Sequence, residues 1–259
     1  MSGIISAIHF TISQGINQYE KVKNIAVMKK FRRFCFGGRQ RRYDMSRKKG
    51  GTVKTLGAAI LAASSAVGKK EKEGPLGDLF DFSDPTDRFG QKTWERSESE
   101  MQRIVFSGAA GKLGIGEEDI DAVFAGDLLN QCVGSAYGLL QFDIPYFGLY
   151  GACSTCAEGL TLAAMTVSAG LYRRAASVTS SHNASAERQY RNPLEYGGQR
   201  TPTAQWTVTG SGAVILQSGG AGPYITYLTP GRIVDAGITD ANNMGSAMAP
   251  AAYETLKAH

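Results

Sequence analysis

The 259-residue sequence has few cysteines and histidines, the residues that often act in catalysis or, for cysteine, form the disulfides of small proteins. It contains four cysteines: Cys35, Cys132, Cys153 and Cys156. They are too few and too irregularly spaced for a disulfide scaffold, so we expect a reducing compartment at synthesis. It contains three histidines: His9, His182 and His259. No further histidine in a convincing catalytic position follows Cys153, which argues against a complete acyl-transfer site.

Long apolar runs are also missing. No segment reaches the roughly 18 apolar residues that span a bilayer. The longest weakly apolar run, Leu56–Gly68, is short and rich in Ala, Ser and Gly. The first residues lack the basic start and clean apolar core of a secretory signal. With 42% hydrophobic residues and 32 glycines, the composition is instead typical of a globular α/β protein with many tight turns.

Positive charge is concentrated at the start of the chain. Residues 1–54 hold 13 basic and 2 acidic side chains, whereas residues 55–259 hold 15 basic and 21 acidic ones. The basic pI therefore reflects this arm, and we expect no nucleic-acid partner. Aromatic residues among the charges would suit attachment to an anionic membrane surface. We favour the simpler interpretation of a solvated tail, or of sequence upstream of a later start at Met28 or Met45.

Strands and helices are predicted to alternate in the rest of the chain. The clearest helices are Trp94–Leu113, which Gly114 ends, and Thr155–Tyr172. In the second helix, Thr155 and Glu158 would form a capping box at the N-terminus. Arg173 and Arg174 would place positive charge at its C-terminus, which suits the helix dipole. Strands are expected at Asp121–Ala125, Tyr146–Tyr150 and Ala175–Ser180. Such alternation predicts a parallel sheet with right-handed crossovers. Four further segments are a weaker helix at Leu128–Gln141, a hairpin or pair of strand segments at Thr207–Ser218, a strand pair at Tyr224–Val234 and a helix at Met244–His259.

Cys153 lies in the strongest local motif, Gly151-Ala152-Cys153-Ser154-Thr155, between a predicted strand and a predicted buried helix. A thiol at a helix N-terminus is favoured as thiolate, and the same amides can accept an anion. The alternative is a structural cysteine that only packs. Cys156 completes a C-x-x-C spacing, but a residue in the first helical turn would point differently from Cys153, so we do not favour redox chemistry.

Three polar residues follow predicted strands at the edge where sites collect in parallel sheets. Asp127 follows the first strand, and Ser181 and His182 follow the third. From spacing alone, Asp127 is better explained as a cap of the next helix. His182 is likewise better explained as a satisfied loop histidine than as a base or a ligand contact.

Seven motifs in order resemble the stage V sporulation AD family over roughly residues 68–259. They are Lys70–Phe80, Phe124–Gln131, Leu149–Thr155, Thr179–Gln189, Glu195–Gln199, Thr207–Ile215 and Gly237–Pro250. The resemblance implies an α/β, thiolase-like fold of two βαβαβαββ halves. Residues 55–218 would form the first half, residues 219–259 would begin the second, and residues 1–54 would remain an arm.

The resemblance also implies a function. The chain would bind dipicolinic acid, alone or as its calcium chelate, for uptake into the forming spore and release at germination. It would act with the other stage V sporulation A membrane proteins, as a peripheral protein of the forespore or spore inner membrane. The resemblance implies no cofactor and no metal held by the protein, and it is compatible with a homodimer.

In this interpretation the chain is not an enzyme. Cys153 occupies a pseudo-nucleophile position, and Asp127, Ser181 and His182 join it in holding the ligand. We hypothesise that Asp127 gives an oxygen to the calcium ion of the chelate. The alternative function is a thiolase or ketoacyl-synthase type of acyltransferase that uses Cys153 as nucleophile.

Overall fold

The structure, a computed structural model, describes residues 51–190, 207–239 and 244–259. Most of the predicted arm, with His9 and Cys35, lies outside the described residues, as does the motif Glu195–Gln199. The strands are β1 (Val53–Val67), β2 (Phe82–Ser83), β3 (Ala122–Gly126), β4 (Tyr146–Leu149), β5 (Arg174–Ser181), β6 (Gly210–Ser218) and β7 (Tyr224–Leu228). The α-helices are α2 (Lys69–Lys72), α3 (Trp94–Leu113), α4 (Val133–Leu139), α5 (Thr155–Ser168), α6 (Asn183–Tyr190) and α7 (Met244–Ala258).

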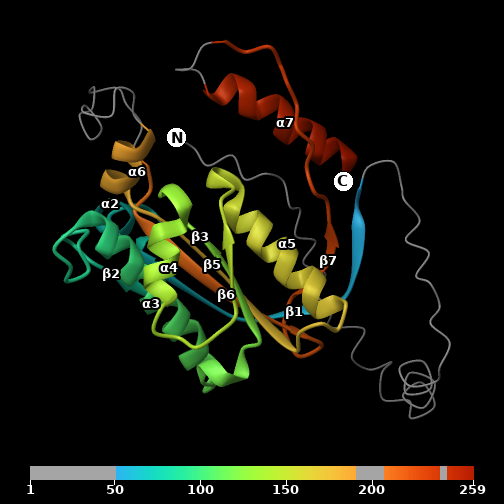
Figure 1. Cartoon of the computed structure of the whole chain (residues 1–259), viewed down its shortest axis with the longest axis horizontal. Coiled ribbons are helices and arrows are strands. Elements are labelled where there is room, and N and C mark those ends of the chain that lie inside the picture. The colour runs from blue at the N-terminus through green and yellow to red at the C-terminus, as the bar shows by residue number, and fades with distance from the viewer. Residues whose placement is uncertain (1–50, 191–206, 240–243) are drawn as a thin grey trace.

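One mixed sheet organises the described part of the chain (Figure 1). Its strand order is β2-β1-β6-β5-β3-β4, and β7 pairs with the first part of β1. The predicted parallel pairing holds for β3 with β4 and for β3 with β5. It is wrong for β6, which runs antiparallel to both β5 and β1. With the short elements set aside, the order β1-α3-β3-α4-β4-α5-β5-β6 is the predicted βαβαβαββ unit.

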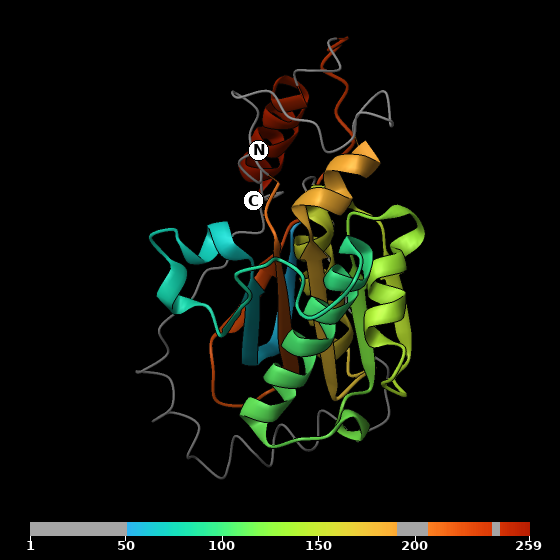
Figure 2. The same cartoon turned by 90° about the vertical axis from the view of Figure 1, so that its left-hand side faces the viewer.

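Helices cover both faces of this sheet (Figure 2). On one face, Val123 of β3 packs with Phe106 of α3 and Leu139 of α4. On the other face, the next residue of β3, Phe124, packs with Leu160 of α5. Neighbouring residues of a strand point to opposite faces, so a strand buried on both sides must be apolar throughout. All five residues of β3 are indeed buried. The chain therefore leaves the sheet at Gly126, directly before the polar Asp127.

Helix α3 has the predicted bounds. The side chain of Thr93 accepts a hydrogen bond from the amide of Arg96, which satisfies one of the free donors of the first turn. Gly114 ends the helix in the left-handed conformation, at φ 64°, that glycine adopts without a steric penalty. Two backbone carbonyls of the last turn, at Ala110 and Gly111, accept its amide.

Helix α5 differs from the prediction at both ends. Thr155 is the first helical residue rather than the cap, and its buried hydroxyl has no hydrogen-bond partner in the described structure. The helix ends at Ser168, and Gly170 follows in the left-handed conformation at φ 71°. The predicted extension to Tyr172 is therefore wrong. Arg174 does not serve the helix dipole but begins β5, where its guanidinium lies 3.1 Å from the Asp119 carboxylate.

The strand predictions at the two ends of the domain also need correction. The weakly apolar run Leu56–Gly68 belongs to the long strand β1, whose low hydrophobicity comes from small residues such as Ala58 and Ala66, both fully buried. Gly57, at φ 78°, lies where the register between β1 and β7 shifts, and β1 pairs with β6 from Ala58 onward. The expected hairpin at Thr207–Ser218 is the single strand β6, and the expected strand pair at Tyr224–Val234 is the single strand β7.

The close approach of β3 and β4 gives a stability prediction. A Cβ at Gly126 would lie 2.2 Å from the backbone oxygen of Leu149, which cannot move aside without disturbing the sheet. We expect Gly126→Ala to lower the free energy of unfolding by about 1–3 kcal/mol. The matched control is Gly111→Ala, on an exposed position of α3 with no atom within 4 Å, which should stabilise by about 0.5–1 kcal/mol. Urea unfolding measures both, and equal effects would contradict the assigned contact.

Candidate functional site

Asp127 stands directly after β3 and organises the loop that follows. Its carboxylate is 1% exposed. One oxygen accepts the amide of Leu129 at 2.8 Å, and the other accepts both the amide and the hydroxyl of Ser135 at 2.6 Å. These bonds join the end of β3 to the first turn of α4, so Asp127 fills the capping role that spacing favoured. Both oxygens are occupied by protein donors, which leaves little capacity for the calcium ion of our hypothesis.

The loop held by Asp127 has an unusual backbone. Gln131 and Cys132 are consecutive residues in the left-handed region, at φ 59° and 56°. Non-glycine residues adopt this conformation only at a cost, which surrounding bonds must offset. The thiol of Cys132 donates to the carbonyl of Leu149 at 3.1 Å and so ties the loop to β4. Burial, and then the charge of Asp127, raise the pKa of this thiol, which makes it a structural rather than a reactive cysteine.

Cys153 lies on an exposed turn at the start of α5. The 3-10 turn Ala152–Ser154 leads directly into the helix, and Ala152 is held in the left-handed region at φ 48°. The amide of Ser154 donates to the carbonyl of Gly151, and that of Thr155 to the carbonyl of Ala152. The structure thus places the Cys153 thiol in solvent at a helix N-terminus, in agreement with its predicted position and against the alternative of a packed core cysteine.

Two further polar side chains belong to the first turn of α5. Glu158 is exposed, and one of its carboxylate oxygens lies 2.5 Å from where a Cβ on Gly151 would stand. Cys156 is also exposed as a residue. Burial of its sulfur nevertheless raises the pKa of the thiol, and a hydrogen bond with Thr179 opposes this rise.

The α5 turn and the Asp127 loop are neighbours. The Cβ position of Gly126, one residue before Asp127, is 2.5 Å from the side chain of Thr155. The charges of Asp127 and Glu158 both act on Cys132, which lies between them. Asp127 and Cys153 are therefore brought to one edge of the sheet, as the sequence predicted, although only Cys153 is open to solvent.

Ser181 and His182 lie at the same sheet edge, but their side chains form hydrogen bonds within the protein. The Ser181 hydroxyl donates to the carbonyl of Val208. The His182 ring is fully buried, with Nε2 2.8 Å from the carbonyl of Asp87 and Nδ1 3.2 Å from the amide of Ala184. Nδ1 thus accepts and Nε2 donates, which defines the neutral tautomer. Burial lowers the pKa of His182 in keeping with this, so it is the satisfied histidine that spacing favoured.

A buried polar network beneath this edge was not predicted from the sequence. Glu98 of α3 is fully buried, and its two oxygens accept the hydroxyls of Ser180 at 3.0 Å and Ser185 at 2.8 Å. The amide nitrogen of Gln102 lies within hydrogen-bond distance of the hydroxyls of Ser180 and Ser135. Ser135 in turn donates to Asp127, so the network connects the two carboxylates. The helical spacing of Glu98 and Gln102, four residues apart on the sheet-facing side of α3, was the signal available in the sequence.

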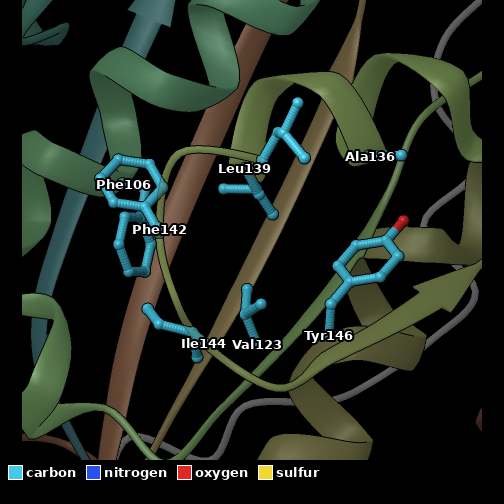
Figure 3. A pocket seen from close by; sticks show the side chains of 8 residues that line it. Phe106, Val123, Ala136, Leu139, Phe142, Ile144 and Tyr146 are labelled. Carbon is cyan, nitrogen blue, oxygen red and sulfur yellow. The ribbon is translucent and has the colours of Figure 1, made fainter.

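A separate cavity of about 240 Å³ lies between α3, α4, β3 and the loop before β4 (Figure 3). Apart from Tyr146, its lining side chains are apolar and include Phe106, Leu139 and Phe142. The ring of Tyr146 closes one side, with its hydroxyl directed toward the side where Ala136 lies. Burial raises the pKa of this phenol to about 12, so it stays neutral. None of the four predicted site residues lines this cavity.

Two searches of the described residues bear on metal and membrane binding. No group of three or more His, Cys, Asp or Glu side chains is arranged to hold a metal ion in the described ranges. Among the helices the structure describes, none combines the length and the apolar character needed to cross a bilayer.

Comparison with known proteins identifies relatives. Residues 52–259 match the family model described as Stage V sporulation protein AD. A curated relative, "Stage V sporulation protein AD" of Bacillus subtilis (strain 168), is 47% identical over 200 residues. This match covers 77% of the chain and 59% of the relative, so the chain spans less than two thirds of the relative's length.

Solved structures with a similar arrangement are condensing enzymes. A 3-oxoacyl-[acyl-carrier-protein] synthase III from Aquifex aeolicus VF5 matches with a TM-score of 0.45 and 13% identity, over 64% of this chain and 55% of that one. The priming β-ketosynthase from the R1128 polyketide biosynthetic pathway matches with a TM-score of 0.42 and 16% identity, over 65% and 52%. We transfer no reaction from these matches.

Proposed function

The chain belongs to the stage V sporulation protein AD family, and on this basis we propose that it binds dipicolinic acid, or its calcium chelate, without catalysing a reaction. The binding would serve uptake of the compound into the developing spore and its release at germination. The observation that carries the proposal is the solvent-exposed turn at Cys153, at the N-terminus of a 14-residue helix next to the carboxyl edge of the sheet. Such a turn attracts a carboxylate through the helix dipole.

The charges around this turn favour the calcium chelate over the free dianion. Glu158 already supplies a negative charge in the first turn of α5, which would repel a second anion. A calcium ion held by two ligand carboxylates would instead gain an oxygen from Glu158, since Ca²⁺ prefers carboxylate ligands. Glu158 is exposed, whereas Asp127 is buried with both oxygens occupied. We therefore reassign the calcium contact from Asp127 to Glu158, and give Asp127 the role of holding the neighbouring loop.

The binding sites for the other partners are less defined. The family membership supports an association with the other stage V sporulation A membrane proteins at the forespore or spore inner membrane, as a peripheral protein. A homodimer is supported by β4, the last strand in the sheet order, whose side chains Tyr146 and Phe147 are 38% and 44% exposed. An open edge with aromatic side chains is suited to pairing with a second copy.

The acyltransferase alternative rests on one feature, the exposed Cys153 thiol at a helix N-terminus. A complete site would also need a base and donors for the oxyanion. His182, the only histidine near this edge in the described ranges, donates to a backbone carbonyl and is buried. It is therefore not available as the base for Cys153, which supports a binding role.

The calcium assignment predicts that substitution of Glu158 has a calcium-dependent effect on binding, whereas substitution of Asp127 has the same effect with and without calcium. We expect Glu158→Gln to weaken binding of calcium dipicolinate about tenfold, close to 1.4 kcal/mol. The same variant should bind dipicolinate without calcium equally well or more tightly, because a repelling charge is lost. Asp127→Asn should weaken both by a similar factor, because it disturbs the loop. Isothermal titration calorimetry of the full chain measures these affinities.

Glu118→Gln is the matched control for that experiment. Glu118 is an exposed carboxylate on the turn before β3, at the opposite edge of the sheet, and its loss should leave both affinities unchanged. A calcium-dependent loss in Asp127→Asn together with normal behaviour of Glu158→Gln would return the metal contact to Asp127. Absence of dipicolinate binding by the wild-type chain would refute the proposed function.

The non-catalytic assignment predicts how the chain responds to an acyl donor. Incubated with a small acyl-thioester, the protein should show no mass increase at Cys153, because no base is placed to assist the transfer. Intact-mass spectrometry followed by peptide mapping measures this, with Cys153→Ser as the control. Stoichiometric acylation that disappears in the variant would establish the acyltransferase alternative.

The β4 edge predicts a concentration-dependent dimer. We expect Phe147→Lys to shift the population toward monomer, because a charge on an edge strand opposes pairing. Leu171→Lys, on an exposed residue of the loop between α5 and β5, is the matched control. Sedimentation velocity measures both, and a dimer that Phe147→Lys leaves intact would place the interface elsewhere.

A further inference from the structure

The Glu98 network holds two carboxylates in the interior. Glu98 and Asp127 are 0% and 1% exposed, and each receives hydroxyl and amide donors rather than a cation. Burying one unpaired carboxylate is costly, and burying two within range of each other is more so. The least costly state of such a pair carries one proton.

Several details indicate which carboxyl group takes the proton. Asp127 accepts three hydrogen bonds, two of them from backbone amides, which favours its charged form. Glu98 receives two hydroxyls but only one backbone amide, and burial, followed by the charge of Asp127, raises its pKa to about 7. Gln102, one turn further along α3, has a buried side-chain oxygen without a donor among the described residues. A protonated Glu98 has an O–H to offer on this same helix face, whereas an ionised one has none.

In the described ranges, no positively charged side chain pairs with Glu98. From the loop after β3 it faces Asp127, which repels it. From β5 and α6 it faces the neutral hydroxyls of Ser180 and Ser185. Arg188, on α6, pairs with Glu95 on the preceding turn of α3 rather than with Glu98.

The remaining neighbours of this region are neutral or backbone groups. His182, at the junction of β5 and α6, is the neutral tautomer described above. The amide of Leu128 donates to Glu98 and so links it directly to the Asp127 loop. Among the residues that the structure describes, the groups that can stabilise an ionised Glu98 are therefore two hydroxyls and one amide.

We propose that Glu98 is a proton switch that controls the Asp127 loop, residues 127–135. With Glu98 protonated, the network is closed and the loop is held against α3 and β4. When Glu98 gives its proton to water, repulsion between the two buried carboxylates loosens the loop. The strain at Gln131 and Cys132 is then less well offset, and the support beside the α5 turn weakens.

The switch has a defined direction. A carboxyl group whose pKa is raised in the folded state stabilises most below its unfolded pKa, near 4.5, and this stabilisation is lost as pH rises through about 7. The opening equilibrium of the loop should increase about tenfold between pH 6 and pH 8 if the open loop restores an ordinary carboxyl pKa. Acidic conditions would favour the closed site and alkaline conditions its opening.

Hydrogen exchange of the ligand-free full chain tests the switch. After correction for intrinsic exchange rates, residues 127–135 of the wild type should lose about tenfold protection from pH 6 to pH 8. Glu98→Gln, which keeps the shape and the hydrogen-bonding capacity of the neutral acid, should show no such change. Residues 160–168 of α5 serve as the internal reference in both proteins. Should Glu98→Gln not fold, the wild-type loop measured against this reference still decides.

Three outcomes would overturn the switch: the same pH response in wild type and Glu98→Gln, no response in either, or an equal response in the loop and in α5. A second arm, which rests on the proposed function, measures dipicolinate affinity with calcium at the same two pH values. We expect wild-type affinity to fall at pH 8, by about tenfold if the open loop predominates and by less if the loop stays mostly closed, and that of Glu98→Gln to stay level. Failure of binding at both pH values with a normal exchange result would refute the proposed function and leave the switch standing.

Discussion

The candidate site depends on the three hydrogen bonds that the Asp127 carboxylate accepts from Leu129 and Ser135. They turn the chain sharply out of a fully buried strand and hold the first turn of α4, which starts six residues after Asp127. The same bonds offset the cost of two left-handed residues in the loop. Cys132 of this loop also donates a hydrogen bond to the carbonyl of Leu149. The Asp127 side chain therefore helps to position the end of β4 and the turn before α5 as well.

Small residues make the arrangement sterically accessible. Gly126 allows the backbone of β4 and the first residue of α5 to approach β3, and Gly159 allows α5 to lie against Ser177 of β5. The outcome is a helix whose N-terminus reaches the sheet edge with an exposed cysteine. Around it, negative charge comes from an exposed Glu158 and from buried carboxylates behind the loop. Negative charge beside an exposed turn favours a ligand that brings a cation, which is consistent with a metal chelate of a diacid.

The sequence predicted those features that follow from local pattern. The bounds of α3 follow from its periodicity and from Gly114, and the positions of Asp127 and Cys153 follow from strand ends and a helix start. β1 was missed because its small buried residues carry little hydrophobic signal. The cap of α5 was misassigned because Thr155 and Ser154 are both plausible caps, and only the 3-10 turn decides between them.

The Glu98 network could not be predicted, because it joins residues up to 87 positions apart whose contacts exist only in the fold. The account as a whole requires that the calcium chelate of the diacid binds at the α5 turn. Backbone amide shifts of residues 151–158, followed by NMR during titration with calcium dipicolinate, test this most directly. We predict saturable shifts centred on these residues, with the lining of the apolar cavity unaffected. Shifts confined to the cavity, or none at residues 151–158 while binding occurs, would contradict the account.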